Sequence, residues 1–324
     1  MTIPSTYNLS LSEKVSLLIT QQKKDWPLFR DNLAGMDKIE SRNFSFGEFQ
    51  ITAQFNPERI RSSAAKTDDA SIRERPCFLC EKNRPKEQQG VDFKGRYTIL
   101  VNPFPIFPEH LTIPLNEHLP QSIMPYFPDM LQLSRELPGF TLFYNGPQSG
   151  ASAPDHFHFQ AGTKMLMPAE REIGKITGLY GGTLYQDDQI KMQWAGKEYL
   201  RKFICMTSAS APAVIRHFML VLTALEKRGQ KDEPMMNILS GFENGSWKIV
   251  IFPRDRQRPR QFFEQGEKQI MMSPASVEFG GLAILPRKED FDKLSHGDLA
   301  DIYSQVTIND TAFNELMQTI RSNL

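Results

Sequence analysis

A short run of alternating residues near the middle of the chain, His156-Phe157-His158-Phe159-Gln160, restricts the fold more than any other stretch. Successive side chains of a β-strand point to opposite faces, so the two histidines and the glutamine share one face while the two phenylalanines share the other. A half-buried strand with incidental histidines is the simpler interpretation. Three polar side chains in register on one face nevertheless favour a strand that carries chemistry on that face and core residues on the other.

The composition is that of a globular protein without a charge bias. Of 324 residues, 40% are hydrophobic and 10% aromatic, which is enough to bury the core of one large or two ordinary domains. Lys+Arg 38 balances Asp+Glu 38, so no overall field favours nucleic acid or an anionic membrane. The N-terminus lacks a secretory signal, and no apolar run approaches the ~18 residues of a membrane span. We expect a cytoplasmic protein whose partners include neither nucleic acid nor membrane, and whose oligomeric state stays open.

The remaining pattern predicts an α+β protein in two halves, at 1–208 and 209–324. The spacing of apolar residues predicts helices at 11–39, 121–137, 212–228 and from 288 onward, with the second interrupted near its prolines. It predicts strands at 44–55, 97–101, 111–115, 140–144, 235–240, 247–252 and 277–285, and a β-meander or irregular insertion at 164–206. Gly47 indicates a turn or bulge within its strand, and Asn244-Gly245 is the turn of a hairpin. Each half is therefore expected to form an antiparallel sheet with flanking helices.

A pair of cysteines suggests a metal site. The chain has three cysteines, an odd number that argues against a disulfide framework. The spacing of Cys77 and Cys80 lets both sulfurs reach one ion, and His118 and His156, at the edges of predicted strands, would complete a tetrahedral set suited to structural Zn²⁺. His110 competes with His118 for the third position. Ordinary buried thiols are the alternative to a metal site.

Two other stretches have both a functional and a plain interpretation. The loop at 145–154 is rich in glycine and serine, so its backbone N–H groups would suit a phosphate, although a simple surface loop has the same composition. Arginines alternate at 254, 256, 258 and 260. Such a run is either a solvated face or a set of contacts to phosphate or nucleotide.

Four local motifs resemble the transferase branch of the histidine-triad superfamily, which includes galactose-1-phosphate uridylyltransferase, diadenosine tetraphosphate phosphorylase and the GDP-L-galactose or GDP-D-glucose phosphorylases. The motifs are Cys77-Phe78-Leu79-Cys80, 102–105 with 110–114, 156–161, and 273–275 with 281–290. The cysteine pair is similar to the zinc-binding pair of the uridylyltransferases. Phe157, however, stands where those enzymes have proline, in the form that the GDP-hexose phosphorylases use, so the chain combines features of two branches.

The resemblance implies covalent catalysis. His158 would attack the α-phosphorus of a nucleoside diphosphate sugar and hold the nucleotide as a phosphoramidate until phosphate or a sugar phosphate accepts it. Gln160 would donate its amide N–H to a phosphate oxygen; glutamine at this place goes with transferases and histidine with hydrolases. The substrate-binding residues implied are Asn102, Asn145, Ser149, Ser152 and Lys164. Zinc on Cys77, Cys80, His118 and His156 would support the loop and strand behind the nucleophile.

The resemblance therefore favours a nucleotidyltransferase or phosphorylase, with a GDP-hexose as the favoured substrate. Two alternatives remain at this stage. One is a nucleotide hydrolase of the same superfamily, which a water-accessible site would permit. The other is a zinc-stabilised nucleotide-binding module without turnover, in which no nucleotide would become covalently attached to the protein.

Overall fold

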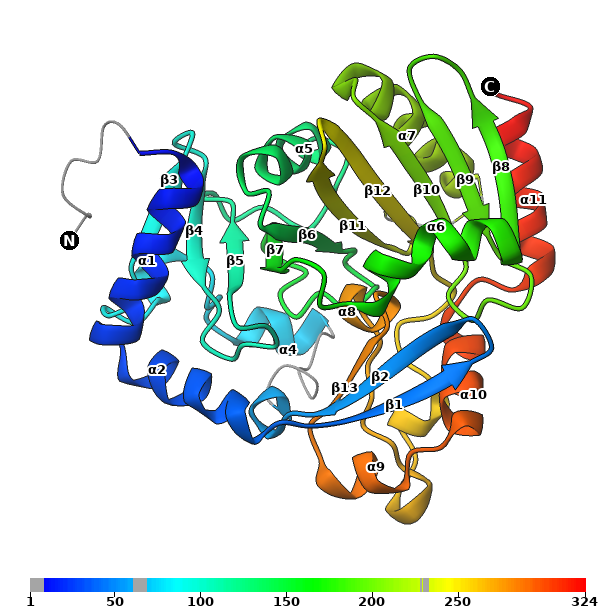
Figure 1. Cartoon of the computed structure of the whole chain (residues 1–324). Coiled ribbons are helices and arrows are strands. Elements are labelled where there is room, and N and C mark those ends of the chain that lie inside the picture. Colours follow the sequence, from blue (N-terminus) through cyan, green and yellow to red (C-terminus); the bar gives the residue numbers. More distant parts are fainter. Residues whose placement is uncertain (1–8, 61–68, 228, 230–232) are drawn as a thin grey trace.

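A single ten-stranded sheet forms the centre of the computed structural model, which describes residues 9–60, 69–227, 229 and 233–324 (Figure 1). Every neighbouring pair of its strands is antiparallel. In order across the sheet the strands are β3 (Gly90–Phe93), β4 (Tyr97–Val101), β5 (His110–Pro114), β7 (His158–Thr163), β6 (Phe140–Asn145), β11 (Met236–Glu243), β12 (Ser246–Pro253), β10 (Phe203–Ser208), β9 (Lys191–Ala195) and β8 (Gly181–Gln186). Within the described ranges, no helix has the length and apolar character that a membrane span requires.

The sheet consists of two sets of five strands with the same topology. Read inward from one edge the order is β3-β4-β5-β7-β6, and read inward from the other edge it is β8-β9-β10-β12-β11. A helix follows the third strand of each set, α5 (Phe127–Glu136) in the first and α7 (Ala211–Glu226) in the second. The expected α+β fold of two halves is confirmed. Strands β8–β10 precede the expected boundary at residue 208 but pair into the second set. We therefore propose that the boundary between the halves lies after β7.

The other helices lie around the two faces and ends of the sheet (Figure 1). They are α1 (Leu11–Asp25), α2 (Pro27–Ala34), α4 (Asp69–Glu74), α6 (Pro168–Tyr180), α8 (Ser276–Phe279), α9 (Lys288–Lys293), α10 (His296–Val306) and α11 (Asp310–Arg321), with short 3₁₀ helices at 35–38, 57–59, 81–83, 260–262 and 266–268. Ser10 and Glu13 cap the start of α1 reciprocally. Its buried face, with Val15 and Leu18, packs beside β3 and β4.

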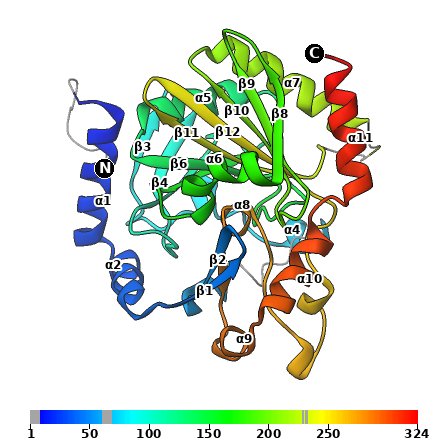
Figure 2. The same ribbon diagram turned by 45° about the vertical axis from the view of Figure 1, so that its right-hand side comes forward.

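Each face of the large sheet is covered by a separate hydrophobic core. Helices α1, α5, α7 and α11 cover one face, and this core includes the fully buried Phe157 and Phe159. The other face packs against α6 and a three-stranded sheet of β1 (Glu40–Phe46), β2 (Phe49–Phe55) and β13 (Leu282–Leu285), which Figure 2 shows below the large sheet. Alternation along 157–160 therefore turns Phe157 and Phe159 into the first core, and it turns His158 and Gln160 toward the second face.

Several of the expected elements differ from those observed. The strand expected at 277–285 is divided: its first part belongs to the short helix α8, and β13 follows Gly281, whose φ is 97°. The helix expected at 121–137 begins only at Phe127. The strand expected at 44–55 is the β1–β2 hairpin, whose turn contains Gly47 at φ 60°. The expected meander at 164–206 contains helix α6 before β8, because Ile173 and Ile176 provide a buried helical face that interior glycines made hard to detect. The Asn244-Gly245 turn is confirmed, with φ of 51° and 76°, as a type I′ hairpin turn requires.

Candidate active site and metal centre

His158 begins β7, and its ring lines a cavity of about 660 Å³. The ring Nδ1 lies 2.9 Å from the backbone carbonyl oxygen of His156. A carbonyl only accepts hydrogen bonds, so Nδ1 carries the proton and Nε2 carries the lone pair. Burial lowers the pKa of His158 to about 4, which keeps the ring neutral near pH 7. The arrangement leaves one basic, uncharged nitrogen for chemistry.

A side chain that the sequence did not single out fixes the backbone of His158. The pairing of β7 with β6 runs only as far as Gln160, which lies opposite Phe143. Before that point Gln121 binds the backbone of His158: its Oε1 accepts from the His158 N–H at 2.9 Å, and its Nε2 donates to the His158 carbonyl at 3.0 Å. The same Nε2 also donates to the carbonyl of Asn145 at 3.0 Å. Gln121 thus joins β7 to the end of β6 at the position of the candidate nucleophile.

Gln160 has its amide orientation fixed by His110. The backbone N–H of Ile106 donates to His110 Nδ1 at 3.1 Å, so the proton of the neutral ring is on Nε2. His110 Nε2 then donates to Gln160 Oε1 at 3.0 Å. Burial lowers the pKa of His110 to about 3, so this ring too is neutral. The amide N–H groups of Gln160 are consequently the end that faces a ligand, which is the orientation that charge stabilisation at a phosphate oxygen needs.

The large cavity combines an apolar wall with a few polar groups. Trp26 and Leu28 contribute from the N-terminal helices, and Phe78, half exposed, lies beneath the guanidinium of Arg75 at 5.2 Å. Polar groups at the other side include Asn102, whose Nδ2 donates to Thr112 Oγ1 at 3.1 Å, together with Ser152, His158 and Gln160. A mostly apolar pocket with convergent polar groups is the usual form of a small-molecule site.

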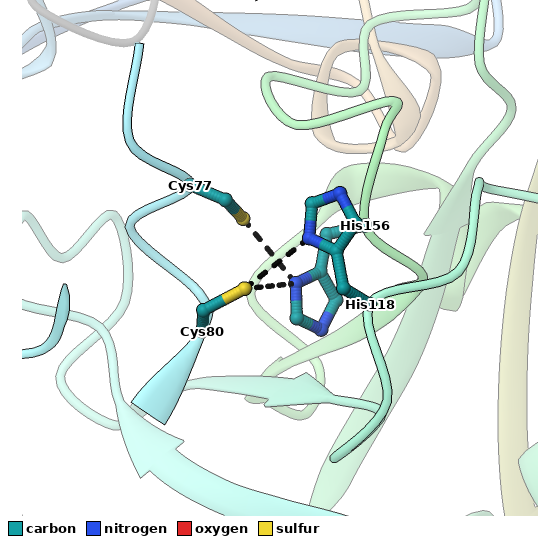
Figure 3. A group of neighbouring side chains, drawn as sticks. All are labelled: Cys77, Cys80, His118 and His156. Atoms are coloured by element: carbon teal, nitrogen blue, oxygen red, sulfur yellow. Dashed lines mark hydrogen bonds between the residues drawn. The ribbon is translucent and has the colours of Figure 1, made fainter. Parts of the chain in front are cut away.

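The four predicted metal ligands lie together at the entrance to β7 (Figure 3). Cys77 Sγ is 3.2 Å from His156 Nδ1, and Cys80 Sγ is 3.2 Å from His118 Nδ1 and 3.5 Å from His156 Nδ1. The four donor atoms all lie within 4.8 Å of one another. Ligands of a tetrahedral zinc with ordinary Zn–S and Zn–N bonds are about 3.3–3.8 Å apart, so the set fits a metal ion.

The surroundings of both histidines suit metal binding. His156 Nε2 lies 2.8 Å from the carbonyl of Leu115, which requires the proton on Nε2 and leaves the Nδ1 lone pair for the metal. His118 Nε2 is 3.7 Å from Asp155, which in turn binds Arg75 at 3.0 Å. The backbone carbonyl of His156 also holds the His158 ring. The metal centre and the candidate nucleophile are therefore linked through one residue.

Comparison with known proteins agrees with this architecture. Residues 205–324 match the family model described as GDPGP1-like, C-terminal domain, and residues 18–163 match a domain of unknown function, DUF4922. Yeast Ap4A phosphorylase in complex with Ap4A superposes with a TM-score of 0.52 at 19% identity, over 89% of this chain and 97% of that chain. Its complex with AMP gives 0.51 at 17% identity, over 89% and 96%. No curated protein sequence matches the chain.

The resemblance to the histidine-triad transferase branch is confirmed. In this chain's own sheet, His158 lies on the fourth strand of its five-stranded set, counted from the edge. At these identities the likeness establishes the fold, and the chemistry is argued below from the side chains.

The structure brings some of the predicted histidine-triad site residues into the large cavity and not others. Asn102, Ser152, His158 and Gln160 line it. Asn145 instead lines a smaller cavity of about 60 Å³ next to it, and its Oδ1 accepts from the N–H and hydroxyl of Ser276. Ser149 is fully buried, and its carbonyl accepts from Asn237 at 2.7 Å. Lys164 lies in a different cavity, where it donates to the Phe242 carbonyl at 3.1 Å.

Proposed function

We propose that the protein is a nucleotidyltransferase of the phosphorylase type that acts on a nucleoside diphosphate sugar, with a GDP-hexose favoured, through a nucleotidyl intermediate on His158. The observation that carries this proposal is the tautomer of His158: Nδ1–H bound to the His156 carbonyl, and a neutral ring lining a cavity of about 660 Å³ beside the amide of Gln160. The GDPGP1-like description of residues 205–324 and the fold of a diadenosine tetraphosphate phosphorylase support it.

The first half-reaction would exchange one bond at the α-phosphorus. The Nε2 lone pair of His158 forms the P–N bond, the bond to the bridging oxygen breaks, and the sugar phosphate leaves with that electron pair. The hydrogen bond from Nδ1 to the His156 carbonyl disperses the positive charge that develops on the ring. The Gln160 amide donates to a non-bridging oxygen without transferring a proton.

The second half-reaction reverses the exchange with another oxygen nucleophile. A phosphate oxygen forms the new P–O bond, the P–N bond breaks, and neutral His158 is regenerated as the nucleoside diphosphate leaves. Two displacements at the same phosphorus allow one set of side chains to serve both steps. The same site would accept a sugar phosphate in place of phosphate in the reverse direction.

A substrate screen tests the proposal against both alternatives. The purified protein would be incubated with GDP-, UDP- and ADP-hexoses, with and without phosphate, and the products separated. Phosphate-dependent release of the nucleoside diphosphate, together with labelled nucleotide retained on the denatured protein, is the expected result. Equal release of nucleoside monophosphate with and without phosphate would instead indicate a hydrolase. Binding of the nucleotide with neither product nor label would indicate a module without turnover.

We also propose that Cys77, Cys80, His118 and His156 hold zinc. Bound there, the metal would supply a closed structural site that keeps the loop before β7 against the loop of the two cysteines. Elemental analysis is expected to find about one zinc per chain, and Cys80→Ser is expected to lose most of it. A content far below one in the wild-type protein would contradict the assignment, independently of any activity.

A further inference from the structure

A second, smaller cavity of about 60 Å³ adjoins the large one. The two share Arg59, Ser152 and Gln160 in their linings, whereas His158 lines only the large cavity. The small cavity has room for a few water molecules or one tetrahedral oxyanion. Gln160 therefore borders both spaces, and the candidate nucleophile borders only the larger one.

Charged and polar side chains from distant parts of the chain converge on the small cavity. Arg59 comes from the 3₁₀ helix after β2 and also donates to the Phe104 carbonyl at 2.9 Å. Arg258 lies over the ring of Phe262 at 4.2 Å, and its Nε donates to Ser273 Oγ at 3.2 Å. Burial lowers the pKa of Arg59 to about 10, a value at which the guanidinium stays charged at neutral pH. Two cations thus border a space of phosphate size.

A carboxyl group completes the lining. Glu278 belongs to the short helix α8, and its Oε2 accepts from the Ala275 N–H at 2.8 Å. Burial raises the pKa of Glu278 to about 7, so the group exchanges between acceptor and donor forms near neutrality. A carboxyl beside two guanidinium groups suits a ligand that is anionic and also carries a hydroxyl.

We infer that the small cavity binds the phosphate group that leaves in the first half-reaction and the one that attacks in the second. Its side chains Arg59, Arg258 and Glu278 recognise a phosphate ligand that bears a hydroxyl. The inference rests on the proposed function. Attacking and leaving groups in phosphoryl transfer are roughly in line, so the leaving phosphate must lie across the α-phosphorus from the nucleophile. Guanidinium groups match phosphate oxygens in geometry and charge. Orthophosphate and a sugar phosphate share this chemistry.

The other arginines of the same run have different places. Arg254 is fully buried, donates from Nε to the Val306 carbonyl at 3.0 Å and supports the loop at 256–257. Arg256 and Arg260 are exposed, and Arg260 pairs with Asp301 at 2.9 Å. Of the two interpretations of the run, phosphate contact therefore applies to Arg258 alone. Arg256 provides a matched control, because it has the same charge two residues away and outside the cavity.

Steady-state kinetics of Arg258→Met and Arg256→Met test the inference. Methionine keeps the packing on Phe262 and removes the charge. Arg258→Met is expected to raise the KM of orthophosphate, or of a sugar 1-phosphate in the reverse direction, by roughly tenfold or more, as the loss of a charge-assisted hydrogen bond predicts. Arg256→Met is expected to leave both values within about twofold, the usual behaviour of an exposed charge. Which of the two KM values rises identifies the source of the phosphate group.

Two further measurements keep the result decisive. Arg258→Lys retains charge and packing but not the planar fork, so a smaller rise in the same KM is expected if Arg258→Met fails to fold. Binding of orthophosphate by calorimetry, without any turnover, separates this inference from the proposed function. Unchanged KM values for both acceptors in a folded Arg258 variant that still acquires nucleotide on His158 would overturn the subsite and leave the proposed function standing. A wild-type protein that binds orthophosphate but never acquires labelled nucleotide would contradict the proposed function and leave the phosphate subsite standing.

Discussion

Strands β7 and β12 have equivalent places in the two halves of the sheet, and of these two strands β7 presents the candidate catalytic groups His158 and Gln160. Gln160 on β7 lies opposite Phe143 on β6, which lies opposite Leu239 on β11, and Leu239 lies opposite Val250 on β12. Directly opposite residues point to the same side of a sheet, so Val250 shares the face of Gln160. The comparison of these two strands therefore concerns side chains on one continuous surface.

On that face β12 presents Lys248, Val250 and Phe252, and the strand contains no histidine. Val250 and Phe252 are buried in the second core, while Lys248 is exposed. A cavity of about 280 Å³ exists there too, between β10–β12 and α6. The same backbone arrangement thus encloses a cavity in each half, but the candidate nucleophile and amide donor are on β7, and β12 has Lys248, Val250 and Phe252 on the corresponding face. Function here resides in a few side chains grafted on a repeated scaffold.

The connections that lead into β7 and β12 also differ. A two-residue type I′ turn joins β11 to β12, whereas residues 146–157 join β6 to β7. The longer connection delivers His156, which belongs to the group of four candidate metal ligands and holds the His158 ring through its carbonyl. Beyond the end of β12, the buried Arg254 organises the nearby carbonyls by hydrogen bonding. The first half thus has a metal-ligand cluster beside its strand, and the second has an arginine.

The largest expected effect separates the two strands by activity. His158→Ala is expected to lower nucleotidyl transfer by at least about 10⁴-fold, or about 5.4 kcal/mol of transition-state stabilisation, because the proposed covalent intermediate forms on this imidazole. Retention of labelled nucleotide on the denatured protein measures it. Lys248→Ala, on the same face of β12, is expected to retain wild-type turnover. Equal losses in both variants would remove the distinction between the halves.

The next largest effect concerns the contribution of β12 to the free energy of unfolding. Phe252→Ala removes a fully buried ring from the second core and is expected to lower the free energy of unfolding by about 3–5 kcal/mol. The turnover of the fraction that stays folded is expected to change little, since Phe252 lines neither of the two adjoining cavities. Urea denaturation and kinetics well below the transition check both parts. A loss of turnover without a loss of stability would mean that β12 takes part in the reaction.

The sequence predicted the features that depend on local periodicity and residue type. The alternation at 156–160 was sufficient to place Phe157 and Phe159 in a core and His158 on the opposite face, because a strand has a period of two. The cysteine spacing and the types of the donors predicted the cluster of four. Whether His110 or His118 completed it depended on the path of the chain after β5, which carries no local signal.

Features formed by distant segments could not be predicted in this way. Gln121 lies in an irregular stretch, so nothing indicated that it would bond the backbone of His158. Lys164 follows β7 directly, but six residues of extended strand separate it from His158 by about 20 Å. Arg258 and Glu278 meet Arg59 only because the C-terminal segment returns to the first half. Loops and crossings of this kind are fixed by tertiary packing rather than by periodicity.

The smallest expected effect concerns His110, a residue that positions Gln160. It sharpens the comparison of β7 with β12, because β12 has Val250 where β7 has Gln160 and so has no amide to orient. His110→Phe keeps the ring volume but removes the donor to Gln160 Oε1, so the amide is free to turn its oxygen toward the phosphate. We expect kcat to fall roughly 10–100-fold with little change in KM, as for the loss of an interaction made mainly in the transition state. His110→Gln restores a donor near the position of Nε2 and should recover part of the loss.

Because burial lowers the pKa of His110 to about 3, the neutral ring persists above that pH, and wild-type kcat should show no inflection from this residue between about pH 5 and 8. A matching rise in KM, or no recovery with glutamine in a folded variant, would assign His110 to the packing of the site instead of the orientation of Gln160.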